Sequence, residues 1–382
     1  MNYIALRMLM GDTAKYIGII FGITFAALIM TQQPSIFVGL MTRTYSFISD
    51  TSYPDLWITD PKVRYVDDIK PMQDTKLLRV RGVDGIKWAV PLYKGMLKVK
   101  IADGSFQNSI IIGLDDATLI GAPAEILKGN LADLRKADAV IINNEGAEKL
   151  GRKAKDGTII PADVGDVLEI NDKRAVIVGI AKTIRPFQSQ PMVYTTYSRA
   201  TNFAPAERLK LSFIIAGLKE GANLTKVKAQ IQNNVGLMAY TAEEFKDLTF
   251  NYFMKNTGIP INFGIAVLLG FLVGTAIAGQ MFYNFTHDNI KQFGALKAMG
   301  TSNMQLVKMI VLQASLAGVT GWGLGVGLAS LFGYLMTGSV LAFKMIWQVP
   351  ALSATGVVII VIVASLISMI KVIRLEPAIV FK

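Results

Sequence analysis

Four long stretches without a charged side chain constrain this 382-residue chain more than any other feature. They lie between Lys15 and Arg43, Lys255 and Asp288, Lys308 and Lys344, and Lys344 and Lys371. A membrane-spanning helix needs about 20 mostly apolar residues, and an ionised group at the bilayer centre costs at least a few kcal/mol. Each stretch is long enough, so the sequence predicts four transmembrane helices rather than buried helices of a soluble protein.

The rest of the composition agrees with an integral membrane protein that carries one large domain outside the bilayer. Hydrophobic residues make up 52% of the chain and the mean hydropathy is +0.42, although the middle of the chain has ordinary soluble character. The first apolar stretch lacks a small-residue cleavage pattern, so we expect a retained anchor rather than a signal peptide.

The distribution of lysine and arginine near the predicted helix ends indicates the orientation. Basic residues cluster in the short segments before the first helix, between the second and third, and after the fourth, whereas the loop between the third and fourth carries only Lys344. The sequence therefore predicts two cytoplasmic termini and a periplasmic middle region. The expected layout is a cytoplasmic segment 1–15, helix 16–40, extracytoplasmic domain 41–255, helix 259–284, cytoplasmic coupling segment 287–303, helix 306–336, outer loop 337–350, helix 351–373 and cytoplasmic tail 374–382.

Charge and cysteine content exclude several classes of function. The net charge of +11 is mostly a topology signal, and no concentrated basic face of the kind that binds nucleic acid is visible. The chain has no cysteine, which excludes disulfides, thiolate metal sites and cysteine nucleophiles.

The middle region shows the mixed pattern of an α+β domain. Segments of β-branched or alternating residues predict strands, and two polar segments predict short helices. The expected strands are 55–60, 96–102, 108–114, 138–144, 166–170, 174–181, 191–197 and 211–218, and the expected helices are 144–151 and 222–235.

Both ends of this region are predicted to be helical. Residues 41–51 prolong the first span, and Thr241 with Glu244 has the spacing of a capping box that begins a helix over 241–255. We interpret the two segments as stalks that carry the outer domain. Interfacial helices lying on the membrane surface are the alternative.

The segment 289–314 has the pattern of a helix, a tight corner and a transmembrane helix. Asn289 to Met299 predicts a helix of about three turns, Gly300 stands where a helix often ends with positive φ, and Ser302 with Gln305 has the spacing of a second capping box. Gly294, Ala295 and Ala298 are expected to leave a small-residue surface that another protein can approach closely. From the residues alone, a partner-docking helix and a plain amphipathic connector remain open.

No constellation of catalytic or metal-binding residues is visible. His287 beside Asp288 has no nucleophile nearby in the sequence, so we predict a structural histidine. The adjacent acidic pairs point in different directions in a strand or helix and are interpreted as solvated surface. They are Asp67 with Asp68, Asp115 with Asp116, and Glu243 with Glu244.

Glycines spaced four apart in the predicted spans let helices pack closely. The pairs are Gly270 with Gly274, Gly321 with Gly325, and Gly323 with Gly327. They serve either a dimer interface or routine packing within one protomer.

One segment resembles a known family. Residues 292–302, QFGALKAMGTS, followed by an apolar helix, resemble the coupling segment of the MacB/FtsX-type ABC transporter permeases. The four-helix layout and the ending Leu375, Glu376, Pro377 are similar too. Within that superfamily the chain is most similar to the DevC-like permeases, whose outer segment often opens like the run from Pro54 to Trp57. Family members frequently carry an acidic residue where Gln292 stands, which weakens the case for a salt bridge there.

The resemblance implies a non-catalytic permease subunit of an ABC transporter in the bacterial inner membrane. It implies a homodimer in membrane lipid, bound to separate ATP-binding subunits that hold ATP and Mg²⁺. Separate subunits are expected because the chain has no G-x-x-x-x-G-K-[ST] phosphate loop. We expect no cofactor in this chain and no nucleic-acid partner. Mechanotransmission would drive export or extraction of an amphiphile, lipid or peptide, with a periplasmic adaptor protein and an outer-membrane channel. The implied coupling residues are Gln292, Phe293, Gly294, Ala295, Leu296, Lys297, Ala298 and Gly300. An FtsX-like regulator of a periplasmic hydrolase and a membrane-anchored ecto-enzyme are the alternatives.

Overall fold

The computed structural model describes residues 2–154, 158–206 and 209–374 and divides into two compact units. The membrane unit comprises residues 1–40 and 258–382, and the outer domain comprises residues 41–257. The predicted family-like ending from Leu375 to Pro377 lies outside the described residues.

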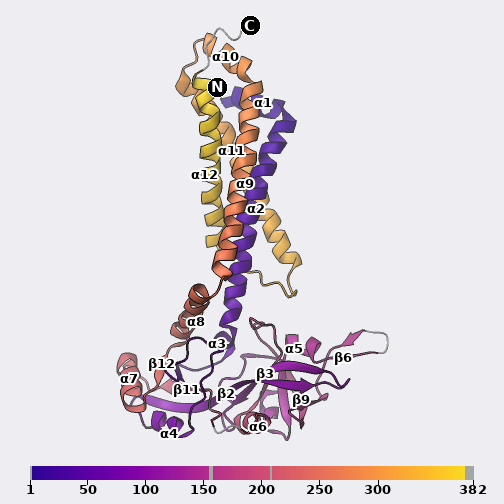
Figure 1. Cartoon of the computed structure of the whole chain (residues 1–382), viewed down its shortest axis with the longest axis vertical. Helices are drawn as coiled ribbons and strands as arrows, with labels where there is room; N and C mark the ends of the chain where they lie inside the picture. Colours follow the sequence, from indigo (N-terminus) through magenta and orange to yellow (C-terminus); the bar gives the residue numbers. More distant parts are fainter. Residues whose placement is uncertain (1, 155–157, 207–208, 375–382) are drawn as a thin grey trace. The chain divides into compact units, whose positions relative to one another are not determined.

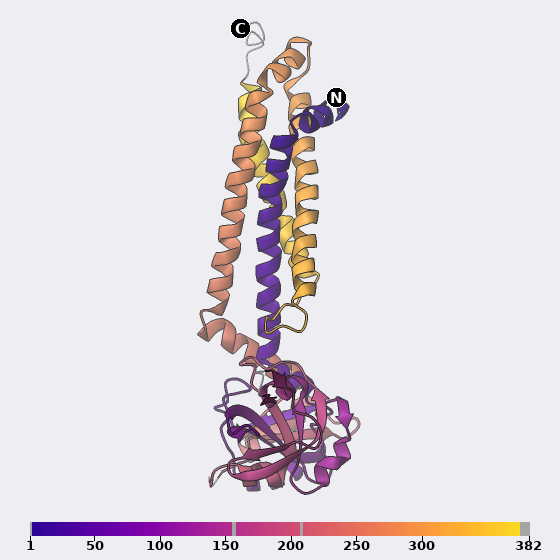
Figure 2. The ribbon, with the colours of Figure 1, turned by 90° about the vertical axis from the view of Figure 1, so that its right-hand side faces the viewer.

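Four helices of the membrane unit are long and apolar enough to cross a bilayer, and they run side by side (Figures 1 and 2). This confirms the predicted four-helix membrane protein. The long helices are α2 (Thr13–Thr44), α9 (Ile259–Asp288), α11 (Asn303–Leu335) and α12 (Gln348–Ile373), and the short ones are α1 (Asn2–Gly11) and α10 (Ile290–Ala298).

Helix α2 lies against α9 and α11 at glycine positions. A Cβ atom on Gly270 or Gly274 of α9 would come within 2.5 Å or 2.2 Å of a side-chain atom of α2, and one on Gly321 or Gly325 of α11 within 2.8 Å or 2.5 Å. These four glycines therefore pack against α2 of the same chain, and a role in a dimer interface remains a prediction. The remaining pair, Gly323 and Gly327, has no such atom within 4 Å.

The outer domain is an α+β domain, as predicted, built on a highly curved sheet (Figure 1). Its strand order is β12-β1-β11-β2-β3-β10-β5-β9-β4, and β8 pairs with both β2 and β9. The pairing of β8 closes β2, β3, β10, β5, β9 and β8 into a ring. The strands are β1 (Leu56–Thr59), β2 (Ile86–Lys100), β3 (Phe106–Leu114), β4 (Glu125–Gly129), β5 (Ala139–Asn143), β6 (Arg152–Lys153), β7 (Ile159–Ile160), β8 (Val167–Ile170), β9 (Lys173–Lys182), β10 (Met192–Thr196), β11 (Phe213–Leu218) and β12 (Met238–Tyr240).

Six α-helices accompany these strands. They are α3 (Ser46–Asp50), α4 (Thr75–Arg81), α5 (Asn144–Lys149), α6 (Tyr197–Phe203), α7 (Leu224–Gln230) and α8 (Ala242–Asn256). Short helical turns cover Leu131–Arg135 and Ile231–Val235. All the strands and both short helices expected from the sequence are present.

The longest strand was predicted for only part of its length. The sequence indicated a strand over 96–102, but β2 begins at Ile86. Residues 89–94 are all buried, so this half of β2 lacks the alternation that marks a half-exposed strand, and Pro91 also argues against a strand.

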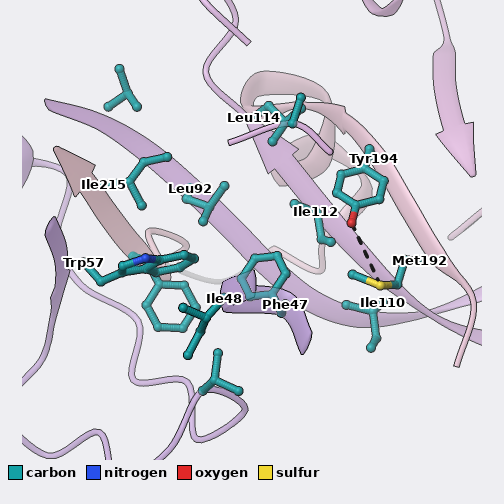
Figure 3. Packing of buried hydrophobic residues seen from close by; sticks show 14 of the residues in the cluster. Phe47, Ile48, Trp57, Leu92, Ile110, Ile112, Leu114, Met192, Tyr194 and Ile215 are labelled. Carbon is teal, nitrogen blue, oxygen red and sulfur yellow. Dashed lines mark hydrogen bonds between the residues drawn. The ribbon is translucent and has the colours of Figure 1, made fainter. Parts of the chain in front are cut away.

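An aromatic cluster forms the centre of one hydrophobic core of the outer domain (Figure 3). The fully buried Trp57 ring lies 5.7 Å from Phe47 and 5.8 Å from Phe213, between ring centroids and edge to face in both pairs. Phe245 of α8 lies 5.7 Å from the same ring. Trp57, which the sequence singled out only by resemblance, is therefore a packing residue.

Helix α8 begins at the predicted capping box. Thr241 Oγ1 accepts from the Glu244 N–H at 3.2 Å, and Glu244 Oε2 accepts from the Thr241 N–H at 2.8 Å. The helix buries Phe245, Thr249 and Phe253 against its own domain. A helix at each end of the outer domain is confirmed, and their use as stalks remains a prediction.

The interpretation of the Asp67–Asp68 pair as solvated surface was wrong for Asp68, which is buried, whereas Asp67 is exposed as predicted. Asp68 is 9% exposed and makes ion pairs with Arg64 at 3.0 Å and Lys70 at 2.8 Å, while Asp67 pairs with the buried ammonium of Lys94. Burial alone would raise the pKa of Asp68, but hydrogen bonds from Lys70 and Arg64 lower it below its ordinary value. Ion pairing compensates the burial of Asp68 and Lys94. Lys94 finds its partner 27 residues away, which spacing alone does not reveal.

Candidate functional site

Helix α10 ends in a tight corner that leads directly into α11. The Gly300 N–H donates to Lys297 O at 3.1 Å and the Thr301 N–H donates to Leu296 O at 3.1 Å, the hydrogen-bond pattern of a Schellman motif. Gly300 has φ +91°, as predicted. The corner satisfies the last carbonyls of α10 with the backbone itself.

The next helix starts two residues later with the second predicted capping box. The Ser302 N–H donates to Gln305 Oε1 at 3.1 Å, and Ser302 Oγ accepts from the Gln305 N–H at 3.4 Å. A C-terminal cap of α10 and an N-terminal capping box of α11 therefore lie within six residues of chain.

One face of α10 is buried by neighbouring helices. Phe293 is fully buried and Leu296 is 8% exposed, and both belong to a cluster with Leu306 and Met309 of α11 and Val372 of α12. The amphipathic pattern explains this face, because both residues are apolar and three apart.

The predicted small-residue surface is only partly available. Gly294 is buried, whereas Ala298 is exposed and Ala295 is half-buried. Gly294 is not available to a partner because it lies next to Phe293 on the buried face of α10. Lys291, Gln292 and Met299 are exposed and complete the free surface of α10 together with Ala298.

Lys297 has a specific partner within the chain. Its Nζ donates to the carbonyl oxygen of Ile373 at 3.1 Å, at the last turn of α12. A cation at a helix C-terminus satisfies a free carbonyl and interacts favourably with the helix dipole. Lys297 therefore joins α10 to α12.

The short helix α1 was not predicted, although it borders the same site. The buried Gln313 of α11 donates its side-chain N–H to Ala5 O at 2.8 Å, and Lys15 makes ion pairs with Asp12 and Asp288, each at 2.5 Å. The amphipathic pattern from Asn2 to Gly11 could have predicted this helix, but the prediction relied on the charge-free stretches alone.

An open groove of about 940 Å³ lies between α1 and the start of α10. Its lining includes Tyr3, Arg7, Asp288 and Gln292. Apolar side chains such as Ile4 and Met8 line it together with polar and charged ones of both signs.

Two family models together match most of the chain. The MacB-like periplasmic core domain matches residues 16–234, more than half of the sequence, and the FtsX-like permease C-terminal domain matches residues 261–377. The chain belongs to the MacB/FtsX-type permeases.

Individual relatives are distant. An uncharacterized ABC transporter permease of Methanocaldococcus jannaschii is 26% identical over 199 residues, which is 48% of this chain and 49% of the relative. The chain thus spans about half the length of this curated relative. Among solved structures, the periplasmic region of MacB from Actinobacillus actinomycetemcomitans has a TM-score of 0.38 at 13% identity, covering 55% of this chain and 96% of that one. The extracellular domain of YknZ from Gram-positive bacteria has 0.33 at 14%, covering 49% and 98%.

Membership explains the two units of this MacB/FtsX-type permease. The periplasmic core model covers most of the outer domain, so that domain is extracytoplasmic, and the FtsX-like model covers α9 to α12. Neither model resolves the closer likeness to DevC-like permeases, which stays a prediction.

His287, the single histidine of this permease, has a hydrogen-bonding partner within the chain. The Lys371 Nζ lies 2.8 Å from His287 Nδ1 and 2.9 Å from Tyr283 Oη, joining α12 to α9. Among residues 2–154, 158–206 and 209–374, no group of three His, Asp or Glu side chains could hold a metal ion.

Proposed function

We propose that this permease is the non-catalytic membrane subunit of an ABC transporter that drives export or extraction of an amphiphile, lipid or peptide from the extracytoplasmic side. Mechanotransmission from a separate ATP-binding subunit would supply the force, and that subunit would bind the ATP and Mg²⁺. The observation that carries the proposal is the doubly capped corner from Lys297 to Gln305. With both helix ends capped, α10 and the start of α11 would move together.

The contacts of α10 support this mechanism. Phe293 and Leu296 pack against α11 and α12, Lys297 bonds the end of α12, and the side-chain N–H of Asn289 donates to Phe285 O of α9 at 2.8 Å. A force on the exposed face of α10 therefore reaches three membrane-spanning helices. Packed interiors transmit such displacements because they are close-packed and hardly compressible.

The proposed assembly follows from the family and from the charges. Two copies of this chain would bind two ATP-binding subunits on the side of α10. The distribution of basic residues predicts that this side, like both termini, is cytoplasmic. A periplasmic adaptor protein and an outer-membrane channel would complete an export pathway. A solute pathway through the helices is not required, since none of α2, α9, α11 and α12 carries an acidic residue in its interior.

A second candidate is a non-transporting regulator of a periplasmic hydrolase. The match of residues 261–377 to the FtsX-like C-terminal model favours it, and the same lever would serve it. The two candidates differ in what the outer domain binds. Pull-down of the full chain from solubilised membranes should recover an adaptor for export and a hydrolase for regulation.

Cysteine crosslinking tests the docking surface directly, because the natural chain has no cysteine. We expect Gln292→Cys and Ala298→Cys to crosslink to the copurified ATP-binding subunit. Val340→Cys, which is 67% exposed in the loop between α11 and α12, is the matched control and should give no crosslink. Equal crosslinking from all three positions, or none from α10, would overturn the proposal.

Gly300→Val should uncouple ATP hydrolysis from the work of the transporter. A Cβ at Gly300 meets no atom within 4 Å, so the cost comes from the backbone at φ +91° and is about 1–2 kcal/mol. The corner would relax into another conformation and lose its stiffness. ATPase rate and substrate movement of the reconstituted complex are the measurements.

Gly300→Asn is the control for that variant, since asparagine tolerates the left-handed conformation better than valine. It should keep most of the coupling. If valine and asparagine behave alike, the conformation of Gly300 does not matter for coupling.

A further inference from the structure

An apolar groove runs between α11 and α12 on the surface of the membrane unit. It has a volume of about 470 Å³ and is lined mostly by valine, leucine, isoleucine and methionine side chains, with Trp322 at one end and Met369 at the other. Both helices cross the bilayer, so hydrocarbon or another protein, rather than water, must fill the groove.

The groove has the length of one leaflet. From Val311 to Trp322 the α11 wall rises about 16 Å at 1.5 Å per residue. The hydrocarbon core of a bilayer is about 30 Å thick, so half of it is about 15 Å. At the far end the Trp322 indole N–H donates to Ser353 Oγ of α12 at 3.1 Å and bridges the two helices. The groove therefore suits one acyl chain that enters from the side of α10.

One cation lies at the open end of the groove. Lys308 is exposed and stands one turn before Val311, on the face of α11 that lines the groove. Arg374, which follows the last residue of α12, lies on the face of that helix opposite the groove. In the described part of the chain the Lys308 side chain has no hydrogen-bond or ion-pair partner, and neither helix contains an acidic residue. Anionic groups at the membrane surface are attracted to such a cation.

The walls of the groove favour a lipid over a second copy of the chain. Helices that pack in membranes meet through small residues, but this groove has branched and long side chains along most of its length. The free small-residue positions of α11, Gly323 and Gly327, are not among its lining residues.

We propose that the groove between α11 and α12 binds an acyl chain of an anionic phospholipid whose phosphate lies against Lys308. The site is separate from the coupling surface of α10. It does not depend on the proposed transport function, only on the membrane-spanning fold.

Photocrosslinking of the full chain tests the occupant. Benzoylphenylalanine at Val358 is placed in the groove, and the protein is reconstituted into nanodiscs of equal phosphatidylglycerol and phosphatidylcholine. We expect phospholipid adducts by mass spectrometry, enriched in phosphatidylglycerol. Adducts to a second copy of the chain, or equal adducts of the two lipids, would overturn the proposal.

Single substitutions test separately how the charge and the groove contribute to lipid binding. Lys308→Ala should lower the phosphatidylglycerol preference about fivefold. Arg374→Ala, on the opposite face of α12, and Lys344→Ala, in the loop beyond the other end of α11, should leave it unchanged. Ser315→Leu and Ala354→Leu each fill the groove and should lower all lipid adducts, with the thermal unfolding temperature measured to show that the fold is kept. An unchanged preference in Lys308→Ala, or unchanged adducts in a folded groove-filled variant, would contradict the site.

Discussion

Gly274→Leu should prevent α9 from packing against α2 and leave most of the protein misassembled. A Cβ at this position would lie 2.2 Å from Ala26 Cβ, 3.2 Å from Ala26 Cα and 3.4 Å from Gly22 O. None of these atoms belongs to a flexible side chain that can swing away, so the two helices must separate. Overpacking of this kind costs about 1–3 kcal/mol or more, and the larger leucine adds to it. The folded fraction in detergent, by size-exclusion chromatography and thermal unfolding, is the measurement.

Gly323→Leu is the matched control, because it places the same side chain on α11 where no atom lies within 4 Å. It should fold like the natural chain. Loss of folding in both variants would mean that leucine at any span glycine is harmful, and normal folding in both would refute the packing described for α2.

Asp50→Asn should stabilise the outer domain at neutral and alkaline pH. Asp50 ends α3, and its Oδ2 accepts from the Ile184 N–H at 2.8 Å. Burial raises the pKa of Asp50 to about 7, and the nearby Glu145 adds to the rise. The asparagine oxygen keeps the hydrogen bond and carries no charge that must be buried.

The sign of the pH dependence follows from the raised pKa. Between the ordinary pKa of 3.8 and about 7, the folded protein holds a proton on Asp50 that the unfolded chain has released. Stability therefore falls as pH rises through this window, by roughly 2–4 kcal/mol after allowance for the remaining solvent exposure. Above pH 7 the penalty is complete, and in Asp50→Asn it is absent.

Unfolding free energies of the full chain between pH 4 and pH 8, followed by the fluorescence of the outer domain, measure this contribution. The natural chain should show the falling slope, and Asp50→Asn should lack most of it. Asp103→Asn is the control, since hydrogen bonds from Ser105 lower the pKa of Asp103 and keep it ionised across the window. A slope that survives in Asp50→Asn would show that another group is responsible.

The sequence alone determined the features that depend on local spacing. Long charge-free stretches identify the helices that span the bilayer, because the hydrocarbon core penalises every charge independently of the fold. The capping boxes at Thr241 and Ser302 and the positive φ of Gly300 were also predictable, since each satisfies backbone groups within three or four residues of itself. The succession of helix, corner and helix from Asn289 to Ala314 could be located for the same reason, whereas its coupling role rests on the family resemblance.

Only the tertiary structure decided which face of each element meets a neighbour. Gly294 was predicted to be available to a partner but is buried, Lys297 donates to the carbonyl oxygen of Ile373, and Gly274 packs against α2 of its own chain. The first half of β2 and the pairing of Lys94 with Asp67 were equally invisible. Such contacts join residues far apart in the chain, and their free energy depends on which surfaces fold together, which no local pattern specifies.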